Sequence, residues 1–173
     1  MTIKDIPAAD GFDPRAFRAA LGCFATGVTV ITAQAQGRRV GVTANSFNSL
    51  SLEPPLILWS LVKTSSSYPT FAAASHFAVN ILADDQIALS NQFARPSDDK
   101  FAGADVTEGQ GGCLLLSETC ATIQCANENI LDGGDHWILI GRVTCFTASE
   151  NPPLLYYRGG YSTAQPHPQV AAL

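Results

Sequence analysis

The chain has 173 residues, of which 46% are hydrophobic and only 14% are charged, and its formal net charge at pH 7 is -5. A chain of this length favours a single domain, large enough to bury a core without disulfide bonds or a structural metal. The charged fraction is well below the roughly 25% of an average soluble domain, which favours a large subunit interface. The acidic balance argues against binding to a nucleic-acid backbone as the main activity.

No apolar run approaches the roughly 18 residues of a membrane-spanning helix, and the longest one, residues 55–62, suits a buried strand. The first five residues lack the basic-then-apolar layout of a secretory signal. The five cysteines include no Cys-x-x-Cys pair, so we interpret them as small buried hydrophobes in a reducing compartment. We therefore expect a cytoplasmic protein that uses no metal, no nucleic acid and no membrane.

The first half of the chain begins with a helix signal. Asp13 is a favoured N-cap, Pro14 fits the first helical position, and the helix should end near Gly22. Beyond it we predict a strand, a hairpin turn, a second strand, a polar loop, an apolar strand, a polar turn and a short helix. In that order these elements cover residues 27–35, 36–38, 39–44, 45–53, 56–62, 63–67 and 70–74.

The second half of the chain contains a predicted helix, a long loop, several strands and a C-terminal tail. Asp84 is placed to cap a helix that runs toward Ala94. Residues 95–112 carry Pro, paired Asp and several Gly and are predicted to be a loop, and residues 164–173 form a tail with little periodicity. The strands predicted in this half cover residues 77–82, 113–116, 119–126, 137–148 and 154–157.

About seven strands with hairpin turns and few short helices predict a mainly β barrel with helical additions. Strands and helices do not alternate, which disfavours a doubly wound parallel sheet. We find no internal repeat and no linker, so we take residues 1–163 as one domain and residues 164–173 as a C-terminal tail.

The common catalytic motifs are missing from the sequence. Gly109, Gly111 and Gly112 lack the spacing and the strand-turn-helix context of a dinucleotide-binding glycine motif. No phosphate-binding loop of the Walker type and no Gly-x-Ser-x-Gly occurs. The three histidines are too scattered for a metal site.

Two patches of small hydroxyl and amide residues remain, over residues 43–49 and 60–67. Such residues combine hydrogen-bond donors and acceptors with little bulk, and polar turns beside a lysine can hold a phosphate. A planar heterocycle with a ribityl-phosphate tail would match this lining. The alternative, that residues 45–49 are a turn and residues 65–67 a helix cap, stays open from composition alone.

The runs TGVTVIT (26–32) and GVTANSFNSLSLEPPLI (41–57) resemble the short-chain flavin reductase family. Further runs agree in the same order, and together they cover nearly all of residues 17–161. They are FAVNIL (77–82), LSNQFA (89–94), DKF (99–101), GDHWILIGRV (134–143) and PLLYYRGGY (153–161).

This resemblance implies an FMN-binding split β-barrel, antiparallel with Greek-key connections and a few short helices, that forms a homodimer. It also implies non-covalent FMN or FAD, NADH or NADPH as co-substrate, and hydride transfer from nicotinamide C4 to flavin N5. The reduced flavin would then pass to a partner flavin-dependent monooxygenase. In such chemistry the cofactors carry the difficult step, and the protein binds and orients them.

The resemblance also assigns residues. The expected contacts to the isoalloxazine ring and ribityl chain are Thr43, Ala44, Asn45 and Ser46. Those expected to line the ribityl-phosphate end are Ser60, Leu61, Lys63, Ser65 and Ser66. Those expected to close over the flavin or its adenylate extension are Phe93, Lys100 and Phe101. His136 is expected as the catalytic residue near the nicotinamide, with Tyr161 on the same face.

Several residues also have a structural interpretation. Asp135 can hold the His136 ring without any catalytic consequence. We interpret residues 38–39 as a solvated hairpin tip and residues 98–99 as a solvated loop or helix cap. Trp59, Phe47 and Trp137 are assigned to the core or to an interface.

Three other functions remain possible from the sequence. The chain could be a member of the same fold that reduces another acceptor, such as a corrinoid, through bound flavin. The chain could instead be a non-catalytic flavin-binding protein, or an interaction barrel with no flavin affinity.

Overall fold

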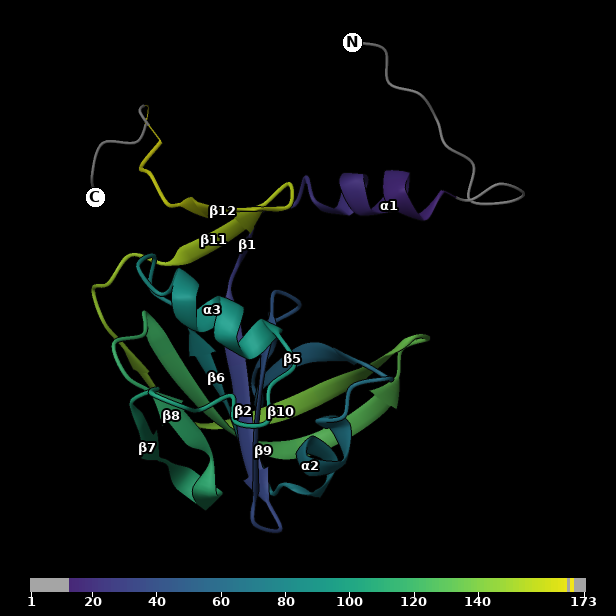
Figure 1. Cartoon of the computed structure of the whole chain (residues 1–173), viewed down its shortest axis with the longest axis vertical. Helices are drawn as coiled ribbons and strands as arrows, with labels where there is room; N and C mark the ends of the chain where they lie inside the picture. The colour runs from purple at the N-terminus through teal and green to yellow at the C-terminus, as the bar shows by residue number, and fades with distance from the viewer. Residues whose placement is uncertain (1–12, 168, 170–173) are drawn as a thin grey trace.

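The computed structural model describes residues 13–167 and 169. Seven antiparallel strands form its main sheet in the order β3-β2-β6-β9-β10-β5-β4 (Figure 1). These strands are β2 (Thr29–Ala35), β3 (Arg38–Ala44), β4 (Asn48–Leu52), β5 (Pro55–Val62), β6 (His76–Ile81), β9 (Ala121–Asp132) and β10 (His136–Ala148).

Two small sheets and a few helices complete the described part. One sheet joins β1 (Thr26–Gly27), β11 (Leu154–Tyr157) and β12 (Gly160–Thr163), and the other joins β7 (Val106–Glu108) to β8 (Leu114–Leu116). The helices are α1 (Pro14–Leu21), α2 (Tyr68–Ala73), α3 (Ile87–Ala94) and the 3₁₀ turn η1 (Gln110–Gly112).

The predicted fold class is confirmed: the protein is mainly β, antiparallel, with few helices. The main sheet does not close into a complete barrel, because β3 and β4 end its strand order. β3 nevertheless lies close to β5, and both strands line one groove. This arrangement is a split β-barrel.

Local sequence signals account for the elements that were predicted. The side chain of Asp13 accepts a hydrogen bond from the Arg15 N–H at 2.8 Å, and Gly22 is the C-cap of α1. At the tip of the β2–β3 hairpin, Gln36 and Gly37 have φ angles of 52° and 74°. Two consecutive residues with positive φ are the signature of the two-residue turn that suits strand twist.

Two predictions were wrong. Residues 48–52, predicted as loop, form β4, because they pair with β5 in an antiparallel hairpin. Asp84 does not cap α3: its N–H bonds to the Pro152 carbonyl, and Gln86 occupies the N-cap position. The short strands β7 and β12 were also missed, since three or four residues give too weak a pattern to detect.

Two apolar clusters fill the barrel. The larger contains Trp59, which is fully buried and packs edge-on against Phe71 and Phe77 with ring centroids 4.9 and 6.1 Å apart. The smaller lies under α3 and contains Phe93 and Phe101. Trp59 thus belongs to the core as predicted, and Phe47 and Trp137 pack half-buried at its margin.

α1 extends away from the barrel, beyond the small sheet of β1, β11 and β12 (Figure 1). None of its residues is buried. Leu21 is 57% exposed, and Phe24, just after the helix, is 74% exposed. Leu21 and Phe24 are therefore left largely uncovered by the rest of the described chain.

The C-terminal tail has no strand or helix over residues 164–167 and 169. Its remaining residues, like residues 1–12 of the predicted domain, lie outside the described part. The boundary at residue 163 stays a prediction.

Candidate functional site

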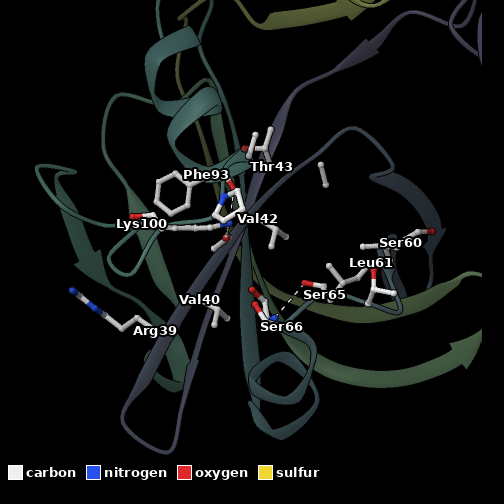
Figure 2. Close-up of a pocket in the computed structure, with 18 of the residues that line it drawn as sticks. Arg39, Val40, Val42, Thr43, Ser60, Leu61, Ser65, Ser66, Phe93 and Lys100 are labelled. Carbon is white, nitrogen blue, oxygen red and sulfur yellow. Dashed lines mark hydrogen bonds between the residues drawn. The ribbon is translucent and has the colours of Figure 1, made fainter.

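A groove of about 1490 Å³ runs along β3 and faces β5, the loop after β5 and the segment after α3 (Figure 2). Its volume exceeds the roughly 300–1,000 Å³ of a pocket for a drug-sized molecule. The predicted site residues that line it are Thr43, Ala44, Asn45, Ser46, Ser60, Leu61, Ser65, Ser66, Phe93, Lys100, Phe101 and His136.

β3 presents a free backbone edge to the groove. It is an end strand of the main sheet, so only its other edge is paired, with β2. Lys100 Nζ donates to the Gly41 carbonyl at 3.1 Å, which shows that Gly41 points its backbone groups to the free edge. Alternate residues of a strand share an edge, so Arg39 and Thr43 present theirs there too. This edge offers main-chain donors and acceptors to a planar ligand.

Beyond the end of β3, polar side chains connect the two sides of the groove. Ser46 Oγ accepts a hydrogen bond from the Ser60 N–H at 2.9 Å and donates to the Ser60 carbonyl at 3.1 Å. Thr43 Oγ1 donates to the Ser90 carbonyl of α3 at 2.6 Å. The Asn45 side-chain amide makes no hydrogen bond with any described residue. Asn45 is therefore the amide in this stretch whose bonding capacity is available to a ligand.

Phe93, Lys100 and Phe101 form a packed unit against β3. The rings of Phe93 and Phe101 meet edge to face at 5.0 Å, and Phe93 is fully buried. A Cβ at Gly41 would lie 2.4 Å from two Phe93 ring atoms, so only glycine allows this approach. Lys100 Nζ also donates to the Phe93 carbonyl at 2.8 Å, and burial lowers the pKa of this amine. The unit fixes α3 and the following segment onto the strand edge.

The loop between β5 and α2, residues 63–67, forms the opposite side of the groove. Its backbone is folded by bonds from the Ser65 N–H to the Val62 carbonyl and from the Tyr68 N–H to the Ser65 carbonyl. Ser65 Oγ accepts from the Ser67 N–H at 3.2 Å. The hydroxyls and backbone N–H groups of Thr64 and Ser66 bond to no described residue, although both residues line the groove. Such unused donors in a polar turn suit a phosphate.

His136 enters the groove at the start of β10, opposite Val62 of β5. Its Nδ1 lies 2.7 Å from Asp135 Oδ1, and this hydrogen bond holds the pKa of the Asp135 carboxyl below its usual range. The Asp135 carbonyl accepts from the Lys63 N–H, and the His136 carbonyl accepts from the Gly133 N–H. A ring held through Nδ1 leaves Nε2 for another partner.

Two predicted site residues lie outside the groove lining. Lys63 Nζ is bound to Asp132 Oδ2 at 2.6 Å and sits 4.7 Å from the centre of the Trp137 ring. Tyr161 lies on β12, where its hydroxyl is 2.9 Å from Ser90 Oγ and donates to Asn91 Oδ1 at 3.2 Å. Lys63 and Tyr161 are thus engaged with other parts of the protein, and the groove as described does not include them.

The structure adds charged residues that sequence reasoning placed in solvent. Residues 38–39 and 98–99 line the groove, where Arg39 Nη2 lies 3.9 Å from Asp99 Oδ1. They were missed because a hairpin tip and a polar loop are each exposed when considered alone. The sequence signal was the presence of an arginine pair and an aspartate pair with opposite charge, although only the folded chain shows that they meet.

Among the described residues no group of three or more His, Cys, Asp or Glu side chains could hold a metal ion. None of the described helices has the length and apolar character needed to cross a membrane.

Comparison with known proteins gives a family match, similar sequences and similar structures. The family described as "Flavin reductase like domain" matches residues 21–165. A Rhizobium meliloti protein named "Probable flavin reductase" is 50% identical over 90% of this chain and 50% of its own length. The reductase subunit HsaB of a flavin-dependent monooxygenase from Rhodococcus jostii is 45% identical over 95% of this chain and 85% of its own.

A solved structure agrees with these relatives. The NADH:FAD oxidoreductase SgcE6 of Streptomyces globisporus, in complex with NAD and FAD fragments, is 33% identical over 94% of this chain and 100% of its own, with a TM-score of 0.84. This chain spans only half the length of the Rhizobium meliloti protein. On the extent of the family match and the identity to the Rhodococcus jostii subunit, the chain belongs to the flavin reductase like domain family.

Proposed function

We propose that the chain is an NAD(P)H-dependent flavin reductase that supplies reduced FMN or FAD to a partner monooxygenase. The observation that carries this proposal is the groove itself. The groove combines a free strand edge, an unbonded amide at Asn45, unbonded hydroxyls at Thr64 and Ser66, and the ring of His136 held by Asp135. Its relatives' names include flavin reductases and reductase subunits of flavin-dependent monooxygenases.

The residues fit a flavin mononucleotide. The β3 edge and Asn45 would hold the polar edge of the ring, and Thr64 with Ser66 would bind its phosphate. The flavin, when bound, supplies the hydride acceptor, so the protein needs no acid-base pair of its own. His136 would orient the nicotinamide through the ring nitrogen that Asp135 leaves free. Donors placed before the reaction stabilise developing charge without reorganisation.

A visible spectrum of the purified protein followed by anaerobic titration tests this function. We expect NADH or NADPH to bleach added FMN or FAD, and steady-state NADH oxidation to saturate with the free flavin. If a corrinoid, for example, saturates the protein and free flavins do not, it reduces another acceptor. If bound flavin keeps its colour with both nicotinamides, the protein is a flavin binder without turnover.

We further infer that the protein is a homodimer that works in the cytoplasm. The uncovered apolar residues Leu21 and Phe24 support the dimer, as does the low charged fraction. All five cysteines are unpaired, which supports a reducing compartment. Sedimentation of the full chain and of the Phe24→Asp variant tests the dimer, and a monomer in both cases would contradict it.

A further inference from the structure

Three cationic side chains other than histidine line the groove within the described residues: Arg38, Arg39 and Lys100. Lys100 is committed to the Gly41 and Phe93 carbonyls. The Arg38 side chain makes no hydrogen bond or ion pair with any described residue. The two arginines are therefore the cations that a ligand in this groove would meet.

Arg39 is held in place without losing its donors. Its guanidinium carbon lies 5.0 Å from the centre of the Phe101 ring, in the geometry of a cation–π contact. Its separation of 3.9 Å from Asp99 is too long for a hydrogen bond. Asp99 Oδ1 instead accepts from the Phe101 N–H at 2.9 Å. The N–H groups of Arg39 remain available, and a guanidinium matches a phosphate in a bidentate manner.

The arginines lie at a distance from the flavin end of the groove. Asn45 lies six positions after Arg39, just beyond the end of β3, which corresponds to about 20 Å of extended backbone. In Figure 2 Ser66 lies between Ser60 and Arg39, so the groove continues past the loop that would hold the first phosphate. A mononucleotide would leave this arginine end of the groove (Arg38 and Arg39) free.

We propose that Arg38 and Arg39 bind the adenosine diphosphate half of a dinucleotide, the part that FAD and NADH share. This inference rests on the proposed function of the same groove. The guanidinium groups bind the diphosphate. The carboxylates of Asp98 and Asp99, which line the groove beside them, accept hydrogen bonds from ribose hydroxyls. The two arginines set the preference for dinucleotides over mononucleotides.

ADP itself is the probe, and the double variant Arg38→Gln/Arg39→Gln of the full chain is the test. We expect this variant to bind ADP and FAD at least about 10-fold more weakly, because each arginine makes a hydrogen bond to a charged group. FMN affinity should stay within about twofold. Arg95→Gln is the matched control, since Arg95 adjoins lining residues but does not itself line the groove.

The source of the diphosphate is settled by two comparisons in the same variants. If the double variant loses affinity for FAD but not for FMN, the site belongs to the flavin. If it loses affinity for NADH but not for reduced nicotinamide mononucleotide, the site belongs to the nicotinamide cofactor. Equal ADP and FAD affinities in the wild type and the double variant would overturn the inference. Inorganic pyrophosphate binding as tightly as ADP would overturn the assignment to an adenosine half. In both cases FMN turnover remains the separate measure of the proposed function.

Discussion

Thr43 and Thr64 carry the same hydroxyl on opposite sides of the groove, yet the two regions use it differently. On the β3 side, Thr43 is bonded to α3 and Lys100 is bonded to two backbone carbonyls. On the loop side, the hydroxyls of Thr64 and Ser66 bond to no described residue. The side chains of Thr43 and Lys100 therefore bind other parts of the protein, whereas the hydroxyls of Thr64 and Ser66 remain available to a ligand.

This difference has a measurable form. Substitutions on the β3 side should lower the free energy of unfolding and weaken the binding of all flavins equally. Substitutions in the loop should leave the free energy of unfolding unchanged and discriminate between phosphorylated flavins and riboflavin.

The largest effect is expected at Gly41 on the β3 side. Gly41→Ala places a Cβ 2.4 Å from the buried Phe93 ring, and the forced movement should lower the free energy of unfolding by about 3 kcal/mol. Urea unfolding measures the loss. Gly27→Ala is the control, because a Cβ there meets nothing within 4 Å. Equal stability of the two variants would show that Phe93 is not packed on β3 as described.

In the loop, Thr64→Val/Ser66→Ala should weaken FMN binding by about 100-fold, since each lost hydrogen bond to a charged phosphate is worth about tenfold or more. Riboflavin affinity should be nearly unchanged. Thr43→Val is the matched control: its hydroxyl is bonded to Ser90, so it should cost about 1 kcal/mol of stability and weaken both flavins equally. Calorimetric titration of each variant with FMN and riboflavin makes the comparison. A uniform loss in the loop variant would remove its phosphate role.

The contrast also shows what a sequence can predict. The helix α1 and the strands of the barrel follow from local signals, since the cap at Asp13, the turn at Gly37 and the alternating strands are all short-range patterns. The polar lining over residues 43–46 and 60–66 was predicted as a group, from residue type and from family resemblance. The predicted residues 43–46, Ser60, Leu61, Ser65 and Ser66 all line the groove. Lys63 was also expected there but is bound to Asp132 instead, and Val62 and Thr64 line the groove although they were not assigned to the site.

The sequence did not show which polar side chains of the groove bind other parts of the protein and which remain unbonded. Nothing in the letters distinguishes the bonded Thr43 from the unbonded Thr64, because the partner of Thr43 is a carbonyl on a helix 47 residues away. The place of Arg38 and Arg39 in the groove was missed for the same reason, because it depends on a segment distant in the sequence. The start of β3 at residues 38–39 becomes part of a groove only when the segment after α3 folds beside it.

His136 combines the two kinds of polar group, because its Nδ1 is bonded to Asp135 and its Nε2 bonds to no described residue. His136→Ala should lower kcat/KM for NADH by about tenfold, the value of one or two lost hydrogen bonds, while FMN affinity changes little. Stopped-flow bleaching of bound FMN by NADH separates the two steps. His136→Gln, which restores an amide donor, should recover part of the rate. Unchanged rates in the alanine variant would leave His136 with only its contact to Asp135.

The smallest effect concerns the charge of Lys100 on the β3 side. Burial lowers the pKa of this amine in the folded protein below its value of 10.5 when unfolded. The unfolded chain therefore binds more protons between these two pKa values, and the contribution of Lys100 to stability rises as pH increases through the folded pKa. The free energy of unfolding of the wild type relative to Lys100→Met should accordingly increase as the pH rises toward 10.5. Both carbonyl bonds survive deprotonation, because a neutral amine still has two N–H donors for the Gly41 and Phe93 carbonyls. A difference that stays flat or falls with pH would contradict the burial of this amine, because it would mean that the Lys100 amine is as well solvated in the groove as in the unfolded chain.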